Sequence, residues 1–170
     1  LLAQIAFDFV EHPVDRFLRL RLLSEGVFPA PPADRATLVR RASLVLSGLP
    51  PTPAEVDAFL RDRSPKAFDS LIDRLLKSPH YGEHWARHWM DVVRFGETLG
   101  YEWNYEVLGA WRYRDYLVRA FNADVPFDRF LQEQVAGDLL PAAGDAERDH
   151  LLTATGFLAL GVKDVNQRFK

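Results

Sequence analysis

Cysteine is missing from this sequence: none of the 170 residues is a cysteine. A disulfide, a thiolate zinc site, an iron–sulfur cluster or a thioether-attached haem therefore cannot form within these residues. We expect no cofactor within this chain. The same absence removes the usual indicator of an oxidising or reducing compartment, since that indicator is the state of the cysteines.

An excess of positive charge and a long apolar run are also missing. The 21 basic side chains are outnumbered by 24 acidic ones, which gives a net charge of −3. Proteins that bind nucleic acid usually carry a basic excess, so we expect no nucleic-acid partner. The apolar runs fall short of the roughly 18 residues that a membrane span needs, and the sequence predicts no transmembrane segment.

Patterns typical of β-strands are scarce, whereas signals for helix starts are frequent. Thr52, Pro53 and Glu55 form a capping box, and a Ser-Pro pair marks a start at Ser64 and another at Ser78. The sequence predicts an all-α fold, an irregular multi-helix bundle of about seven or eight helices of typical length with a long aromatic-rich loop. Further helices are expected over residues 13–25, 34–48, 110–122, 124–138 and 146–160.

The two ends differ in composition from the middle of the chain. Residues 1–11 form an apolar run without an initiator methionine or a basic start, so they are not typical of an intact signal peptide. Residues 162–170 are mainly polar. We interpret residues 1–11 as the end of a preceding segment or linker, residues 12–161 as the helical domain, and residues 162–170 as the truncated start of a following region.

Tryptophan and tyrosine are confined to one part of the sequence. All four tryptophans and all five tyrosines fall between residues 81 and 116. These side chains join an apolar body to a polar tip and favour interfaces and clefts. Residues 96–109 predict an irregular loop, long enough to be functional or interfacial. The sequence leaves three interpretations of this loop open. Its aromatic side chains tie it to the core, a partner domain covers it, or it forms part of a ligand cleft. Helical spacing indicates that Trp85, Trp89 and Trp111 face the core.

The loop and its flanks supply the candidate binding residues. Aromatic rings stack on apolar faces, carboxylates orient hydroxyl groups, and arginine stacks on rings or forks onto carboxylates. A network of arginine, tryptophan and glutamate that holds the loop is one interpretation, and an anion site is another. No catalytic residue is identified, and the sequence does not decide whether the chain is an enzyme. The candidate binding residues are Tyr101, Trp103, Tyr105, Glu97, Glu102, Arg94 and Arg112.

His84 and His88 stand four residues apart in a predicted helix, with Asp91 three residues further on. This spacing puts the three side chains on one side of the helix, as in helical metal sites. Two histidines without a third ligand from elsewhere are more typical of a structural pair. We therefore expect no metal site, with His84, His88 and Asp91 as the weak candidates.

Four stretches together resemble a known family. The family is a domain of unknown function in large, mostly exported proteins of planctomycetes and related bacteria, described as cytochrome-c-associated. The resemblance runs from about residue 12 to residue 161. The stretches are residues 49–56 (LPPTPAEV), 78–91 (SPHYGEHWARHWMD), 110–115 (AWRYRD) and 130–141 (FLQEQVAGDLLP).

The sequence departs from the family pattern in two places. The family typically has arginine where this chain has His84, so a pair of His84 and His88 would be peculiar to this protein. The family also continues into a Cys-x-x-Cys-His-type motif, whereas this chain has no cysteine. The resemblance therefore allows haem in neighbouring domains and none within these residues.

The resemblance implies a location and a set of partners. The location is periplasmic or otherwise exported, and the partners are neighbouring domains of the same polypeptide, including a cytochrome c domain. We expect a structural or interaction module. One alternative is a carbohydrate-binding or carbohydrate-active domain that uses the aromatic loop, with carbohydrate as its ligand. The other is part of a redox enzyme whose haem or metal ligands lie outside this chain.

Overall fold

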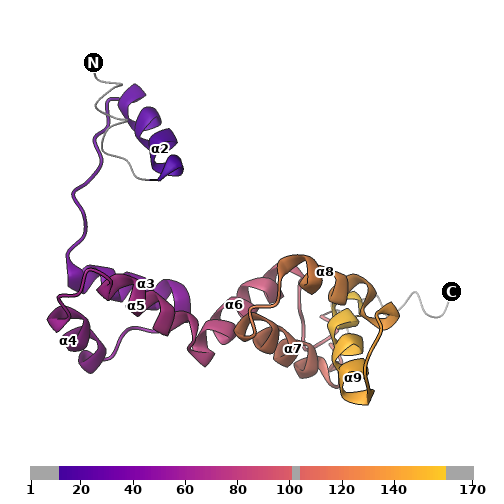
Figure 1. Ribbon diagram of the computed structural model, residues 1–170. Coiled ribbons are helices and arrows are strands. Elements are labelled where there is room, and N and C mark those ends of the chain that lie inside the picture. Colours follow the sequence, from indigo (N-terminus) through magenta and orange to yellow (C-terminus); the bar gives the residue numbers. More distant parts are fainter. Residues whose placement is uncertain (1–11, 101–103, 160–170) are drawn as a thin grey trace. The chain divides into compact units, whose positions relative to one another are not determined.

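The computed structural model describes residues 12–100 and 104–159 (Figure 1). Within these ranges it contains eight α-helices, two short 3₁₀ helices and no strand, which confirms the all-α prediction. An isolated antiparallel bridge joins Thr98 to Glu106. The helices are α2 (Pro13–Ser24), α3 (Arg35–Ser47), α4 (Pro53–Arg61), α5 (Ala67–Leu76), α6 (Pro79–Val92), α7 (Ala110–Asn122), α8 (Phe127–Ala136) and α9 (Asp145–Ala154), with 3₁₀ helices η1 (Gly137–Leu139) and η2 (Thr155–Leu158).

The chain divides into two compact units, Leu1–Asp34 and Arg35–Lys170. In the first unit, helix α2 has no buried residue. Its apolar side chains Val14, Phe17 and Leu18 are all exposed. A helix of 12 residues gains most of its stability from packing of its apolar face against another surface. The predicted domain limits at residues 12 and 161 stay a prediction.

Local sequence signals explain most of the helix starts. The capping box is present at α4, where Thr52 Oγ1 accepts a hydrogen bond from the Glu55 amide and Glu55 accepts one from the Thr52 amide. Ser78 caps α6 through the amide of His80. The start expected at Ser64 comes later, because Ser64 forms a turn with the amide of Lys66 and α5 begins at Ala67.

The second unit contains two apolar clusters. One joins α3, α4 and α5, and the other joins α6, α7, α8 and α9. Burial of one such side chain contributes about 1.5–3 kcal/mol, so these clusters dominate the stability of the fold. The buried members of the first are Val39, Phe59, Ala67, Leu71 and Leu75, and those of the second are Ala86, Tyr113, Tyr116, Leu117, Ala120, Phe130 and Ala154.

Helices α6 and α7 pack closely because a glycine allows it. A Cβ atom on Gly82 would lie 2.5 Å from the Val118 carbonyl oxygen. The Gly82 amide donates to Asn122 Oδ1 at 2.8 Å, and Asn122 Nδ2 donates to the Pro79 carbonyl at 3.1 Å. These contacts hold the beginning of α6 against the end of α7, and this places the aromatic face of α6 beside the connection from α7 to α8.

Candidate functional site

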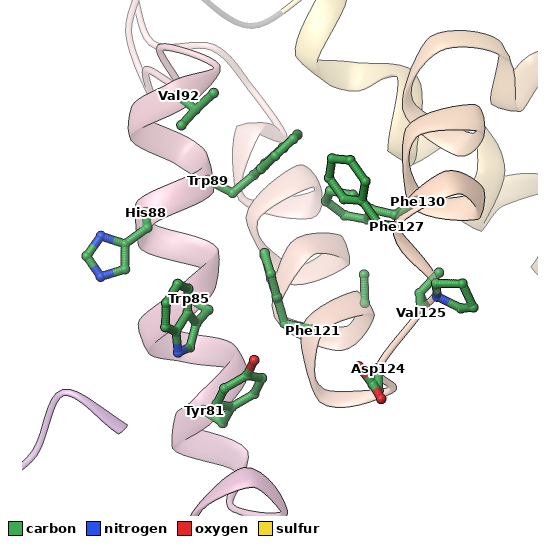
Figure 2. Close-up of a pocket in the computed structure, with 12 residues that line it drawn as sticks. Tyr81, Trp85, His88, Trp89, Val92, Phe121, Asp124, Val125, Phe127 and Phe130 are labelled. Carbon is green, nitrogen blue, oxygen red and sulfur yellow. The ribbon is translucent and has the colours of Figure 1, made fainter. Parts of the chain in front are cut away.

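An aromatic groove lies between α6, the end of α7 and the start of α8 (Figure 2). Its volume is about 440 Å³. Figure 2 shows Trp89 pointing from α6 toward Phe127 and Phe130 of α8. The centroid of the Trp89 ring is 6.4 Å from that of Phe127 and 5.0 Å from that of Phe130. Half of the lining side chains are aromatic. The groove is lined by Tyr81, Trp85, His88, Trp89, Val92, Ala120, Phe121, Asp124, Val125, Pro126, Phe127 and Phe130.

The mouth of the groove is apolar and exposed, whereas its floor is buried. Val92 and Phe127 at the mouth are 71% and 65% exposed. Phe130 and Ala120 on the floor are 5% and 4% exposed. The groove is therefore a depression in a packed core whose rim offers apolar side chains to whatever binds there.

A second apolar feature continues from the groove along α8. We define the α8 stripe as Phe127, Leu131, Val135 and Leu139. Phe127, Leu131 and Val135 follow one another at intervals of four within α8, so they lie on successive turns of the helix, and Leu139 lies in the 3₁₀ helix η1 that follows. All four are exposed. Helix α8 thus has two different sides: a buried one with Phe130, Glu133 and Gln134, and the exposed α8 stripe.

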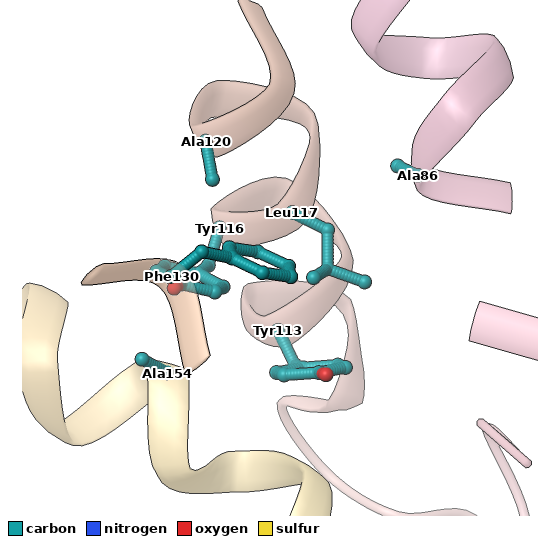
Figure 3. Packing of buried hydrophobic residues seen from close by; sticks show 7 residues of the cluster. All are labelled: Ala86, Tyr113, Tyr116, Leu117, Ala120, Phe130 and Ala154. Carbon is teal, nitrogen blue, oxygen red and sulfur yellow. The ribbon is translucent and has the colours of Figure 1, made fainter. Parts of the chain in front are cut away.

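Buried polar contacts hold the floor of the groove in place. Figure 3 shows Tyr113, Tyr116 and Leu117 projecting from α7 into the cluster that includes Phe130. Gln134, which is 1% exposed, accepts hydrogen bonds from the Tyr113 hydroxyl at 2.5 Å and from Trp89 Nε1 at 3.0 Å. One amide oxygen therefore joins α6, α7 and α8. This arrangement orients the Trp89 ring that faces the groove.

A buried carboxylate completes this polar core. Glu133 accepts a hydrogen bond from the Tyr116 hydroxyl at 3.0 Å and one from Arg129 Nε at 2.8 Å. His150 Nε2 of α9 lies 3.5 Å from the same carboxylate. A buried carboxylate with several partners is compatible with a folded core, whereas an unpaired one would strongly destabilise it. These contacts assign Glu133 to the stability of the fold.

Burial makes the two core tyrosines hard to ionise. Desolvation raises the pKa of Tyr113 to about 12. Desolvation, together with the Glu133 carboxylate, also raises the pKa of Tyr116. A free tyrosine has a pKa near 10. The unfolded chain therefore loses these protons at a lower pH than the folded chain does.

Alkaline pH is expected to unfold the chain through these tyrosines. Stability is fully present below about pH 10 and falls as pH rises from about 10 to 12, by roughly 1.4 kcal/mol per pH unit for each tyrosine. Denaturation with urea between pH 9 and 11.5 measures the slope. Tyr113→Phe should reduce it, while Tyr105→Phe, at an exposed position, should leave it unchanged. A midpoint that stays constant to pH 11.5 would contradict the assignment.

The two helical histidines contact each other. His84 Nε2 and His88 Nε2 are 3.4 Å apart, and the rings meet edge to face. Desolvation, and then the neighbouring His88 and Arg87, lower the pKa of His84. No group of three histidine, aspartate or glutamate side chains that could hold a metal ion occurs in residues 12–100 and 104–159. Asp91, the third candidate, is exposed.

The predicted loop joins α6 to α7 and is held by backbone contacts. The Leu99 amide donates to the Tyr105 carbonyl and the Val107 amide to the Glu97 carbonyl, both at 2.8 Å. Glu97 of the loop lies 3.6 Å from Arg114 of α7. The ring of Tyr105 is 57% exposed.

The other loop candidates lie apart from the groove. Arg94 has a left-handed backbone, with φ of 55°. The Arg112 guanidinium lies 5.6 Å from the centre of the Trp111 ring. None of the predicted binding residues that the structure describes lines the aromatic groove. Tyr101, Glu102 and Trp103 lie outside the described residues, and the predicted roles of all seven stay predictions.

The expectation that three tryptophans face the core is wrong for Trp111. Trp85 and Trp89 are partly buried, but Trp111 is 51% exposed. Trp111 lies near the start of α7, where its neighbours Ala110 and Tyr113 are the buried residues. The helical phase of α7 therefore points Trp111 outward.

One comparison with known proteins identifies the family. A family model described as PSCyt2, a protein of unknown function (DUF1549), matches residues 13–170. The chain belongs to the PSCyt2 family. PSCyt2 is a planctomycete cytochrome-associated domain of unknown function, as the four sequence stretches indicated. Comparisons with curated proteins and with solved structures gave no significant match.

Three of the four stretches that carry the PSCyt2 resemblance meet in the cluster of α6, α7, α8 and α9. Tyr113, in residues 110–115, donates a hydrogen bond to Gln134, in residues 130–141. Gly137, also in residues 130–141, packs on the Leu151 carbonyl. Residues 78–91 supply Trp89 to the same hydrogen-bond network. These parts of the PSCyt2 pattern thus maintain the fold that forms the groove.

Sequence reasoning missed the groove. Its phenylalanines, Phe121, Phe127 and Phe130, fall outside the segment in which tryptophan and tyrosine gather. The available signal was in α8, where Phe127, Phe130, Leu131 and Val135 spread over a wide arc of one short helix and not all of them face the core.

Proposed function

We propose that this PSCyt2 domain is a protein interaction module, and that the aromatic groove and the α8 stripe together dock a neighbouring domain of the same polypeptide. The observation that carries the proposal is the row of exposed apolar side chains that begins at the mouth of the groove with Phe127 and continues through Leu131 and Val135. Contiguous apolar surface of this kind marks interaction sites in folded proteins.

Helix α2 supports the same function independently. It carries exposed Val14, Phe17 and Leu18 and buries no residue. An apolar helix face gains stability only when another surface covers it. The apolar face of α2 is thus suited to packing against another surface.

The family provides the nature of the neighbours. The PSCyt2 name associates the domain with cytochrome-containing proteins. We propose that a cytochrome c domain is among the neighbours and that haem belongs there. No helix in the described residues is long and apolar enough to cross a membrane. Export to the periplasm or beyond is part of the same proposal, because c-type cytochrome partners would place the domain there.

The carbohydrate and redox alternatives stay predictions. The former depends on the loop aromatics, of which Tyr105 is exposed. The latter depends on ligands outside this chain. The groove supports docking more directly, since its lining is apolar and its rim is uncovered.

The docking proposal predicts an effect on binding without an effect on folding. The double variant Leu131→Asp, Val135→Asp should weaken association with the remainder of the natural polypeptide by about tenfold or more, as loss of interface anchors does. Calorimetric titration of the two separately produced parts measures it. The variant should stay folded, with a loss of stability of no more than about 2 kcal/mol, because Val135 is 65% and Leu131 38% exposed.

Gln132→Asp is the matched control. Gln132 is exposed on the same helix but lies outside the α8 stripe. Gln132→Asp adds one of the two carboxylates that the double variant adds, on the same helix, and it should leave association within twofold. Association that is equally strong with the double variant would contradict docking through the α8 stripe.

A further inference from the structure

We infer that the aromatic groove receives a basic side chain, arginine or lysine, that projects from an apolar segment of the docked polypeptide. This inference rests on the proposed function, because it assigns the chemistry of the docked segment. It predicts that the groove discriminates between a charged side chain and a neutral one of the same shape.

The first support is the aromatic lining. Tyr81 and Trp85 have ring centroids 6.1 Å apart on one wall, and Trp89 meets Phe127 and Phe130 further along. The faces of such rings carry partial negative charge and attract a cation within about 6 Å, with tryptophan the strongest. A site with several rings therefore favours a cation with an apolar stem over a purely apolar side chain.

The second support is charge. Asp124 is the one permanently charged side chain among the twelve that line the groove. It is exposed, and its carboxylate has neither a hydrogen bond nor an ion pair within the part of the chain that the structure describes. A cation bound in the groove would gain this carboxylate as its partner, and an anion would be repelled by it.

The third support is the position of Asp124 directly after α7. This helix ends at Asn122, with Ala123 as its cap. The C-terminal end of a helix carries a partial negative charge that favours cations. The carboxylate and the helix end thus act in the same direction at one end of the groove.

Continuity with the α8 stripe favours a polypeptide segment as the source of the cation. Phe127 belongs both to the groove and to the α8 stripe. A segment that covers Leu131 and Val135 with its own apolar residues passes the mouth of the groove, where one long side chain can enter. Arginine and lysine have apolar stems that suit such a path.

The test compares two capped peptides, acetyl-Ala-Leu-Arg-Leu-Ala-amide and the same peptide with citrulline in place of arginine. Citrulline keeps the shape and removes the charge. Binding to the 170-residue chain is measured by NMR, from shifts of the indole N–H signals. The arginine peptide should bind about tenfold more tightly than the citrulline peptide, with the largest shifts at Trp85 and Trp89. Asp124→Asn should reduce the preference to about twofold, and it suits the left-handed backbone at this position (φ 48°), which asparagine adopts readily.

Asp128→Asn is the control, since Asp128 is exposed nearby but does not line the groove. It should leave the preference intact. Equal binding of the two peptides, no binding of either, or a preference that Asp124→Asn leaves intact would overturn the inference. Binding of acetyl-arginine amide as tightly as the arginine peptide would also overturn it, because the groove would then take a small cation. The docking proposal would survive these outcomes, since it is tested by the α8 stripe variants.

Discussion

Replacement of Phe130 by alanine is expected to lower the free energy of unfolding by about 3–5 kcal/mol. The Phe130 ring is 5% exposed, stacks on Tyr116 at a centroid distance of 6.2 Å, and contacts Trp89 and Phe121. Its removal leaves a cavity at the meeting point of α6, α7 and α8. Chemical denaturation followed by circular dichroism measures the change.

Phe127→Ala is the matched control, three residues earlier. The same atoms are removed, but the ring is 65% exposed, so the expected cost is below about 1 kcal/mol. The contrast separates the two sides of α8: the buried side maintains the fold, and the α8 stripe is available for docking. Equal losses at Phe127 and Phe130 would show that the α8 stripe belongs to the core.

Gly137→Ala should also be strongly destabilising. A Cβ atom at Gly137 would collide with the carbonyl oxygen of Leu151, which is backbone within α9 and cannot rotate away. The Gly137 backbone is helical, with φ of −59°, so the requirement for glycine is one of space. Overpacking against backbone costs about 1–3 kcal/mol or more, and thermal unfolding should show a correspondingly lower midpoint.

Gly144→Ala provides the comparison. No atom lies within 4 Å of a Cβ at Gly144, and its φ of 178° is extended. This change should be neutral or raise stability by up to about 1 kcal/mol through the unfolded state. If Gly137→Ala were as well tolerated as Gly144→Ala, the close packing of η1 on α9 would be wrong.

The helices could be predicted because their signals are local. Thr52 and Glu55 satisfy each other's backbone within one turn, and Ser78 caps α6 in the same way, so the sequence alone predicts both starts. Ser64 shows the limit of such signals. The same side chain can cap a helix or close a turn, and the choice depends on where Ala67 packs against the core.

The groove could not be predicted in the same way, because it joins residues that are distant in the sequence. Tyr81 and Trp85 meet Val125 and Phe127 only because Gly82 lets α6 approach α7. Hydrophobic spacing also does not say which of the apolar side chains of a helix are covered. Spacing alone therefore placed Trp111 in the core, although it is exposed, and it did not distinguish exposed Phe127 from buried Phe130.

The most direct test of the docking surface uses the absence of cysteine from the chain. Val135→Cys, in the α8 stripe, and Gln132→Cys, outside it, each add a single thiol to these 170 residues. Maleimide labelling is followed by peptide mass spectrometry in this chain alone and in the natural full-length polypeptide. The proposal predicts that Val135→Cys reacts about tenfold more slowly in the full-length polypeptide, because an interface excludes water from its centre, while Gln132→Cys reacts at the same rate in both. Equal labelling of Val135→Cys in the two would contradict the claim that a neighbouring domain covers this face.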